Sequence, residues 1–226
     1  MVDVYWNKMA GVQIKERNVA VDGNGYLSLS MDPYSGVIVV PAGADTNEKG
    51  TAPPPSGKVK FVGVDDITKG SWLGVYGEDG YIIFGDQSLI PHYATVSYVN
   101  GDIAFWAAST TAERALQKPS KPNERLIARR EHSLHQIIDV RVRQGPKKLA
   151  LYFCDFDRQN RQMVVDVIDA NSMDVLDSNI VNDFPNGKYL RYELDGHVQF
   201  RLTKFFYDHY WKPGNAVISA IFFGEK

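Results

Sequence analysis

The stretch GSWLGVYGEDGYIIFGDQSLIPHY, residues 70–93, narrows the fold class more than any other part of the chain. It combines five glycines with several large rings, among them those of Trp72, Tyr76, Tyr81 and Tyr93. Glycine disfavours a buried helix, and a flexible linker does not usually contain so many aromatic side chains. The stretch therefore predicts short strands joined by tight turns, with the rings either inside a β-sandwich or at its rim.

The composition excludes several classes of protein. The 226 residues are 44% hydrophobic and 23% charged, which predicts a folded core rather than a disordered chain. The net charge is −2 and the basic residues are scattered, so we expect neither nucleic acid nor an anionic membrane as a partner. No apolar run approaches the roughly 20 residues of a membrane span, and the first residues lack the order of a signal peptide. The single cysteine, Cys154, excludes an internal disulfide and is interpreted as a packing residue.

A proline-rich segment divides the chain. Residues 44–58, ADTNEKGTAPPPSGK, have the composition of a semi-extended linker. Residues 1–43 before it contain short strand patterns and turn sequences; they predict the closing strands of a small, truncated β domain, the alternative being an extension packed on the main body. Residues 59–226 after it predict a β-sandwich, because strand patterns recur there with turn residues between them.

Within the second part, apolar residues occupy every second position, as at Ile138, Val140 and Val142. The Asn100–Gly101 pair predicts a type I′ hairpin turn between residues 94–99 and the strand that follows. Residues 109–119 have a helical composition, so the sequence allows at most one short helix.

Five segments, taken in order, carry a resemblance to a known class of module. They are W-x-G-x-Y-G-x-D-G-Y (72–81), ALQKP (115–119), LALYFCDFDRQNRQMVVDVIDA (149–170), GKYLRYELDGHVQFRLT (187–203) and NAVISAIFFG (215–224). Together they resemble the galactose-binding-like, jelly-roll β-sandwich modules at the C-terminal ends of secreted bacterial glycoside hydrolases, a class that includes many carbohydrate-binding modules. Residues 22–43 are similar to the closing strands of the small β domain that follows many glycosidase catalytic domains.

This resemblance implies a non-catalytic accessory region of a larger, secreted or cell-surface, polysaccharide-degrading enzyme. Its implied partners are a polysaccharide or oligosaccharide and the catalytic domain of the same parent chain. The alternative is a structural module that packs on that catalytic domain and binds no glycan. Catalysis by the chain itself is the third and least favoured interpretation. Carboxyl pairs in loops more often bind calcium or cap backbone amides than act as the acid and base of a glycosidase.

Candidate glycan-binding residues follow from the chemistry of sugar recognition, in which rings stack on the sugar and polar groups bind its hydroxyls. Trp72 falls in an alternating segment that predicts a strand, and we interpret it as a core residue. Tyr76 and Tyr81 flank a predicted turn, GEDG, and are either rim rings or core. A second aromatic cluster lies at residues 203–216, in a segment longer than the resembling modules have. The predicted glycan-binding residues are Tyr76, Glu78, Asp79, Tyr81, Arg114, Tyr207, Tyr210 and Trp211.

Two further expectations concern charge. A structural calcium ion is predicted, because such folds often hold one and calcium takes oxygen ligands; the candidates are Asp155, Asp157 and Glu225. The alternative is that these carboxylates are solvated or paired with Arg158 and Arg161. Positive charge for an acidic glycan is available from Arg125, Arg129 and Arg130, unless these form a solvated strand edge.

Overall fold

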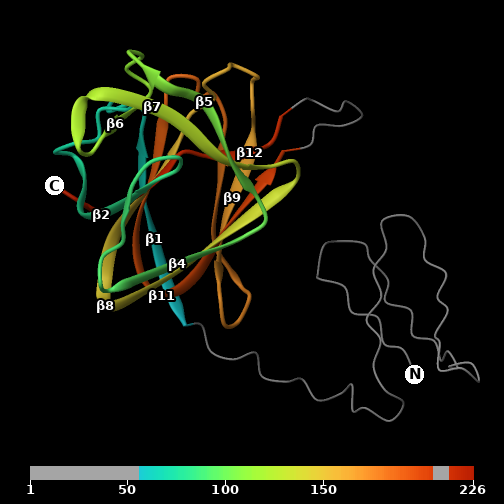
Figure 1. Cartoon of the computed structure of the whole chain (residues 1–226). Coiled ribbons are helices and arrows are strands. Elements are labelled where there is room, and N and C mark those ends of the chain that lie inside the picture. Colours follow the sequence, from blue (N-terminus) through green and yellow to red (C-terminus); the bar gives the residue numbers. More distant parts are fainter. Residues whose placement is uncertain (1–55, 206–213) are drawn as a thin grey trace, which may run out of the picture. The chain divides into compact units, whose positions relative to one another are not determined.

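The computed structural model describes residues 56–205 and 214–226 (Figure 1). These residues belong to one compact unit, Pro53–Lys226. They form thirteen strands and, within these described ranges, no helix, so the predicted all-β, sandwich-like architecture is confirmed. The predictions for residues 1–43, and for the linker as far as residue 55, lie outside the described residues. The first strand, β1, begins at Gly57, so the last two residues of the predicted linker belong to a strand.

The larger sheet has nine antiparallel strands. Its main path is β10-β9-β11-β8-β13-β2-β3, with β1 also paired to β11 and β4 also paired to β8. The strands are β1 Gly57–Asp65, β2 Tyr76–Ile83, β3 Ser88–Leu89, β4 Ala94–Val99, β8 His135–Phe153, β9 Met163–Asp169, β10 Val175–Val181, β11 Lys188–Lys204 and β13 Ala220–Glu225.

Two long strands, β8 and β11, hold this sheet together. Residues often found in turns lie inside both strands, Gly145–Pro146 in β8 and Gly196 in β11. In the structure the chain bends at these points without reversing: Gln144, Gly145 and Gly196 have positive φ angles, and the β8–β11 register shifts between Leu194 and Gly196. A bulge of this kind bends a strand and increases its twist. One half of β11 can therefore pair with β1 and the other half with β9.

The smaller sheet has four strands, seen together in the upper part of Figure 1. Its path is β12-β7-β5, with β6 also paired to β7; the strands are β5 Asp102–Thr110, β6 Leu116–Lys118, β7 Lys121–His132 and β12 Ala216–Ile218. The predicted hairpin at Asn100–Gly101 is wrong. Both residues have the positive φ angles of a type I′ turn, but β4 pairs with β8 in the larger sheet and β5 pairs with β7 in the smaller one.

Residues 109–119, where the sequence allowed at most one short helix, form no helix. A turn closes between Ala112 and Ala115, where the amide N of Ala115 donates to the carbonyl of Ala112 at 2.9 Å, and β6 follows directly. Ala115 and Leu116 are fully buried. Tertiary packing and pairing with β7 therefore override the helical composition of this segment.

The predicted GEDG turn lies inside strand β2. Gly80 explains why the segment stays extended there: a Cβ at this position would lie 2.2 Å from the carbonyl oxygen of Leu89. The glycine therefore permits close approach of a neighbouring backbone instead of making a turn. Trp72 lies in the loop before β2 and not in a strand, but it is buried, and its indole N–H donates to the carbonyl of Gln117 at 2.9 Å.

Two clusters of buried side chains form the core. One gathers mostly aliphatic residues of β8, β9, β11, β12 and β13, such as Val140 and Leu151, together with rings such as that of Phe200. The other gathers rings, including Trp72 and Tyr189, with residues of β6 and β7. A buried carboxylate fixes the start of the unit: Asp169 accepts the backbone N–H groups of Ser56 and Gly57, each at 2.6 Å. It also accepts those of Asn171 and Ser172, at 2.9 and 2.7 Å, in the β9–β10 turn.

Candidate functional site

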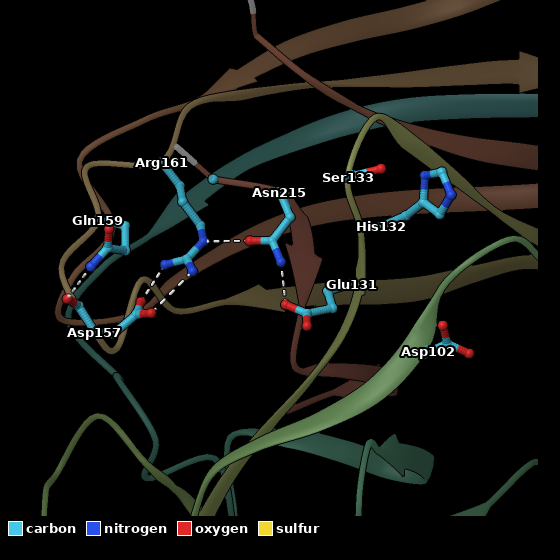
Figure 2. Close-up of a pocket in the computed structure, with 9 residues that line it drawn as sticks. Asp102, Glu131, His132, Ser133, Asp157, Gln159, Arg161 and Asn215 are labelled. Carbon is cyan, nitrogen blue, oxygen red and sulfur yellow. Dashed lines mark hydrogen bonds and ion pairs between the residues drawn. The ribbon is translucent and has the colours of Figure 1, made fainter. Parts of the chain in front are cut away.

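A polar cleft of about 590 Å³ is the candidate site (Figure 2). Four segments supply its walls: the start of β5, the end of β7 with its turn to β8, the β8–β9 loop, and the residues just before β12. The lining residues are Asp102, Glu131, His132, Ser133, Asp157, Gln159, Arg161, Gly214 and Asn215. Every side chain in this set is polar, which suits a ligand that hydrogen-bonds along its length better than an apolar one.

Arg161 organises one side of the cleft. It is buried, and its Nη1 donates to the carboxylates of both Asp155 and Asp157 while its Nη2 donates to Asp157 Oδ2 at 3.1 Å. Burial acts to lower the pKa of Arg161, but the two carboxylates outweigh it and raise the pKa above its ordinary value. For Asp157, burial acts to raise the pKa, and the hydrogen bond and charge of Arg161 more than offset it. Both groups therefore stay charged at neutral pH.

A chain of hydrogen bonds continues from Arg161 across the cleft. Arg161 Nε donates to Asn215 Oδ1 at 2.8 Å, and Asn215 Nδ2 donates to Glu131 Oε2, as Figure 2 shows. Arg129 Nε reaches the same Glu131 oxygen, and the guanidinium of Arg129 lies 4.2 Å from the ring centroid of Trp106. Each of these side chains is hydrogen-bonded to the next one, so these polar groups are oriented before a ligand binds.

The β7–β8 turn is fixed by a histidine. His132 Nδ1 accepts the backbone N–H groups of Leu134 and His135, both at 3.2 Å. This pattern requires an unprotonated Nδ1, so in this structure any ring proton is on Nε2. His132 and Ser133 thereby add a second set of oriented polar groups to the cleft wall.

The structure places the aromatic and acidic candidates of β2 away from this cleft. Tyr76 is 4% exposed, stacks on Tyr189 with ring centroids 4.4 Å apart, and donates its O–H to Asp65 at 2.6 Å. Asp79 accepts the O–H of Tyr93 at 2.8 Å. Tyr81 is half-buried and donates to Gln87, and Glu78 is exposed on the same strand. The ring of Tyr76 is therefore not available for stacking on a sugar in this conformation.

The remaining glycan-binding candidates divide into two groups. Arg114 lies with its guanidinium 4.5 Å from the ring centroid of Phe156 and is not part of the cleft lining. Tyr207, Tyr210 and Trp211 lie outside the described residues, so their predicted roles stay predictions.

The arginines considered for an acidic glycan donate mainly to protein groups. Arg125 donates to the carbonyls of Glu113 and Ala115 and to Ser71. Arg130 donates to the carbonyl of Asn100, and Arg129 pairs with Glu131.

The carboxylates predicted to bind calcium have arginine partners. Asp155 and Asp157 both pair with Arg161, and Glu225 pairs with Arg191. Within residues 56–205 and 214–226, no three or more His, Cys, Asp or Glu side chains gather as a metal site would require. The calcium ion stays a prediction that these contacts do not test.

Sequence reasoning named Asp155, Asp157 and Arg161 but not the residues opposite them. Glu131 and Asn215 are 84 positions apart in the chain, and only the pairing of β12 with β7 brings them together. Asp102 faces Glu131 for a similar reason, because β5 pairs with β7 on the other side. No local motif marks these positions.

Comparisons with known proteins found no matching protein-family model, no matching curated protein and no matching solved structure. Among the residues that the structure describes, no helix has the length and apolar character needed to cross a membrane. The residues of the cleft are therefore the basis on which a function can be proposed.

Proposed function

We propose that this unit is a non-catalytic carbohydrate-binding module and that its ligand occupies the polar cleft. The observation that carries the proposal is the fixed chain of hydrogen bonds from Asp157 through Arg161 and Asn215 to Glu131. Sugars present many hydroxyl groups that both donate and accept, and they require several oriented polar partners at once. A chain of mutually held side chains supplies such partners at low entropic cost, because little side-chain motion is lost on binding.

The cleft also has the size and wall composition for a short glycan. A volume of about 590 Å³ lies within the ordinary range of small-ligand sites. None of its described lining residues is Phe, Tyr or Trp, so this part of the site would bind mainly by hydrogen bonding. Stacking rings are proposed from the sequence alone, at Tyr207, Tyr210 and Trp211, which come shortly before the lining residue Gly214 in the chain.

The charge state of the cleft favours binding over hydrolysis. A glycosidase needs one carboxylic acid that stays protonated until it protonates the leaving group, and such acids have raised pKa values. Asp157 instead has a lowered pKa, and Glu131 is held by two donors. We therefore propose a non-catalytic role.

The wider setting is proposed from the resemblance described above. In this proposal the unit is a jelly-roll, galactose-binding-like module of a secreted or cell-surface enzyme that degrades polysaccharides. The sugar-binding unit would hold that enzyme near its substrate.

Calorimetric titration of the purified chain with neutral, acidic and amino-sugar oligosaccharides tests this function. Asn215→Ala breaks the chain of hydrogen bonds in the cleft, and we expect it to weaken binding at least tenfold, since a hydrogen bond to a charged group contributes about 1.5–3 kcal/mol. The matched control is Asn179→Ala, which removes an asparagine bonded to Asp177 and Tyr192 elsewhere in the molecule. Equal affinity for the two variants would exclude the cleft as the binding site.

A second candidate function is supported by strand β5. It is an edge strand, paired only with β7 among the described strands, and it exposes Ile103 (51%) and Phe105 (53%). Exposed edges with apolar side chains favour association with another chain or domain. In this alternative the unit is a structural module. Sedimentation velocity of the chain and of its Ile103→Lys variant would show an association that the variant loses.

A further inference from the structure

Two asparagines in the described part of the chain are each followed by glycine. Asn100–Gly101 links β4 of the larger sheet to β5 of the smaller one, and Asn186–Gly187 lies in the turn before β11. Both asparagines are exposed. An asparagine before glycine is prone to deamidation, because glycine has no side chain to hinder attack by its backbone nitrogen on the asparagine amide. The contacts around each pair decide which of them reacts faster.

The two pairs differ at the nitrogen that would attack. The backbone N–H of Gly187 donates to the carbonyl of Phe184 at 3.2 Å, so this nitrogen is held in a turn. The N–H of Gly101 donates no hydrogen bond within residues 56–205 and 214–226. A Cβ at Gly187 would lie 2.0 Å from the hydroxyl oxygen of Tyr152, whereas one at Gly101 would come no closer than 3.1 Å to the carbonyl oxygen of Glu131. Gly101 therefore has the more accessible nitrogen.

A guanidinium contacts the peptide group that would react at the first pair. Arg130 Nη2 donates to the carbonyl of Asn100, which belongs to the same peptide group as the N–H of Gly101. The guanidinium also lies 4.5 Å from the ring centroid of Tyr98, which helps to hold it there. When the N–H of Gly101 loses its proton, the negative charge is shared between the nitrogen and this carbonyl oxygen. Arg130 therefore stabilises the attacking form of the peptide, as an oxyanion-hole donor stabilises developing charge.

The amide nitrogen that would leave has a titratable neighbour. Asn100 Nδ2 lies 3.5 Å from Nε2 of His135, the first residue of β8. An imidazole titrates near neutral pH, so its protonated form can give a proton to the departing nitrogen. The nucleophile and the leaving group thus each lie close to a side chain suited to their change of charge.

We propose that Asn100 is a site of self-modification, at which the Asn100–Gly101 peptide forms a succinimide and then aspartate or isoaspartate. The nitrogen of Gly101, after giving its proton to solvent, bonds to Cγ of Asn100. The bond from Cγ to Nδ2 breaks, and Nδ2 takes up a proton and leaves as ammonia. Water then opens the ring at either carbonyl, so one water is consumed and one ammonia released. The inference does not depend on the proposed glycan binding.

The product changes both the charge and the length of the link between the sheets. Either product places a carboxylate beside Arg130, two positions before the cleft residue Asp102. Isoaspartate also adds one carbon atom to the main chain, although Val99 and Asp102 on either side are paired into different sheets. We therefore expect the isoaspartate form to melt at a lower temperature than the unmodified chain.

Peptide mapping by mass spectrometry of the folded chain, incubated at mildly alkaline pH, tests the proposal. We expect Asn100 to deamidate about tenfold faster than Asn186, a smaller effect than one donor has in a closed active site, because the link is exposed to water. In urea the two rates should become similar, since neither pair keeps its contacts. Arg130→Met should slow the reaction at Asn100 by about the same factor and leave Asn186 unchanged. The matched control, Arg158→Met, replaces an exposed arginine of the β8–β9 loop and should affect neither rate.

The folded wild-type chain decides the matter even if Arg130→Met does not fold. Equal rates at the two asparagines, or a faster rate at Asn186, would overturn the inference. An unchanged rate at Asn100 in the folded Arg130→Met variant would do the same. Cleavage of the chain after Asn100 in place of deamidation would also overturn it, because the side-chain nitrogen would then be attacking the backbone carbonyl.

Discussion

Replacing Arg161 tests how much its ion pairs with Asp155 and Asp157 contribute to the free energy of unfolding. Arg161→Met keeps much of the side-chain length and removes the positive charge between Asp155 and Asp157. Asp155 is only 2% exposed, so the variant leaves a buried carboxylate without its counter-ion. Loss of one partner of a buried ion pair typically costs about 3–5 kcal/mol.

The structure places the expected cost at the lower end of that range. Asp155 also accepts the backbone N–H groups of Gln159 and Arg161, each at 3.2 Å, and these bonds do not depend on the arginine side chain. We therefore expect a loss of about 3 kcal/mol in the free energy of unfolding. For a unit of this size the melting temperature should fall by about 10 °C.

Urea denaturation at neutral pH measures this difference, with Arg158→Met as the matched control. Arg158 is an exposed arginine of the same loop, and its replacement should change stability by less than about 0.5 kcal/mol. The double variant Asp155→Asn with Arg161→Met should be more stable than the sum of the two single effects predicts, because it leaves no uncompensated charge. Additive losses, or equal effects of the two arginine variants, would refute the reasoning.

Three other predictions follow from the same contacts and from the sequence. Burial acts to raise the pKa of Asp169, but its backbone hydrogen bonds outweigh burial and lower the pKa to about 2; the stability it contributes should be present above pH ~4 and be lost as the pH falls towards ~2. Asp169→Asn should cost about 2–3 kcal/mol at neutral pH and flatten the acid limb of a stability–pH curve, and an unchanged curve would contradict this account. Chelation with EDTA decides between the two alternatives for Asp155 and Asp157: if they bind the predicted calcium the melting temperature should fall, and if they only pair with Arg161 it should stay unchanged. Tyr210→Ala combined with Trp211→Ala should weaken glycan binding without reducing stability; full binding by the folded variant would remove these rings from the site.

Much of the larger sheet could be predicted from the alternation of apolar and polar residues alone. Residues 94–99 were predicted as a strand and form β4 with the same bounds. Alternation could not show that β4 and β5 belong to different sheets, because a type I′ turn has the same local sequence whether or not its flanking strands pair. It also could not distinguish a turn from a bulge at Gly145 and Gly196, since both require a positive φ.

The site was less predictable than the fold. The aromatic content of residues 70–93 led to the prediction that Tyr76 binds glycan. Its ring is instead part of the core, because Tyr189 and Phe222 pack against it. The acidic motif around Asp155 was visible, and its pairing with Arg161 was one of the alternatives. Glu131 and Asn215 could not be found, because their meeting depends on long-range strand pairing and not on spacing along the chain.

The central claim, that the polar cleft binds glycan, is tested most directly by mapping a bound oligosaccharide with backbone amide NMR. We expect the largest chemical-shift changes at residues 131–133, 157–161 and 214–215, with Asp102 also affected. Little change is expected at Tyr76 or elsewhere on β2. Saturable shifts confined to another surface, or the absence of shifts with every glycan that the full chain binds, would contradict the account.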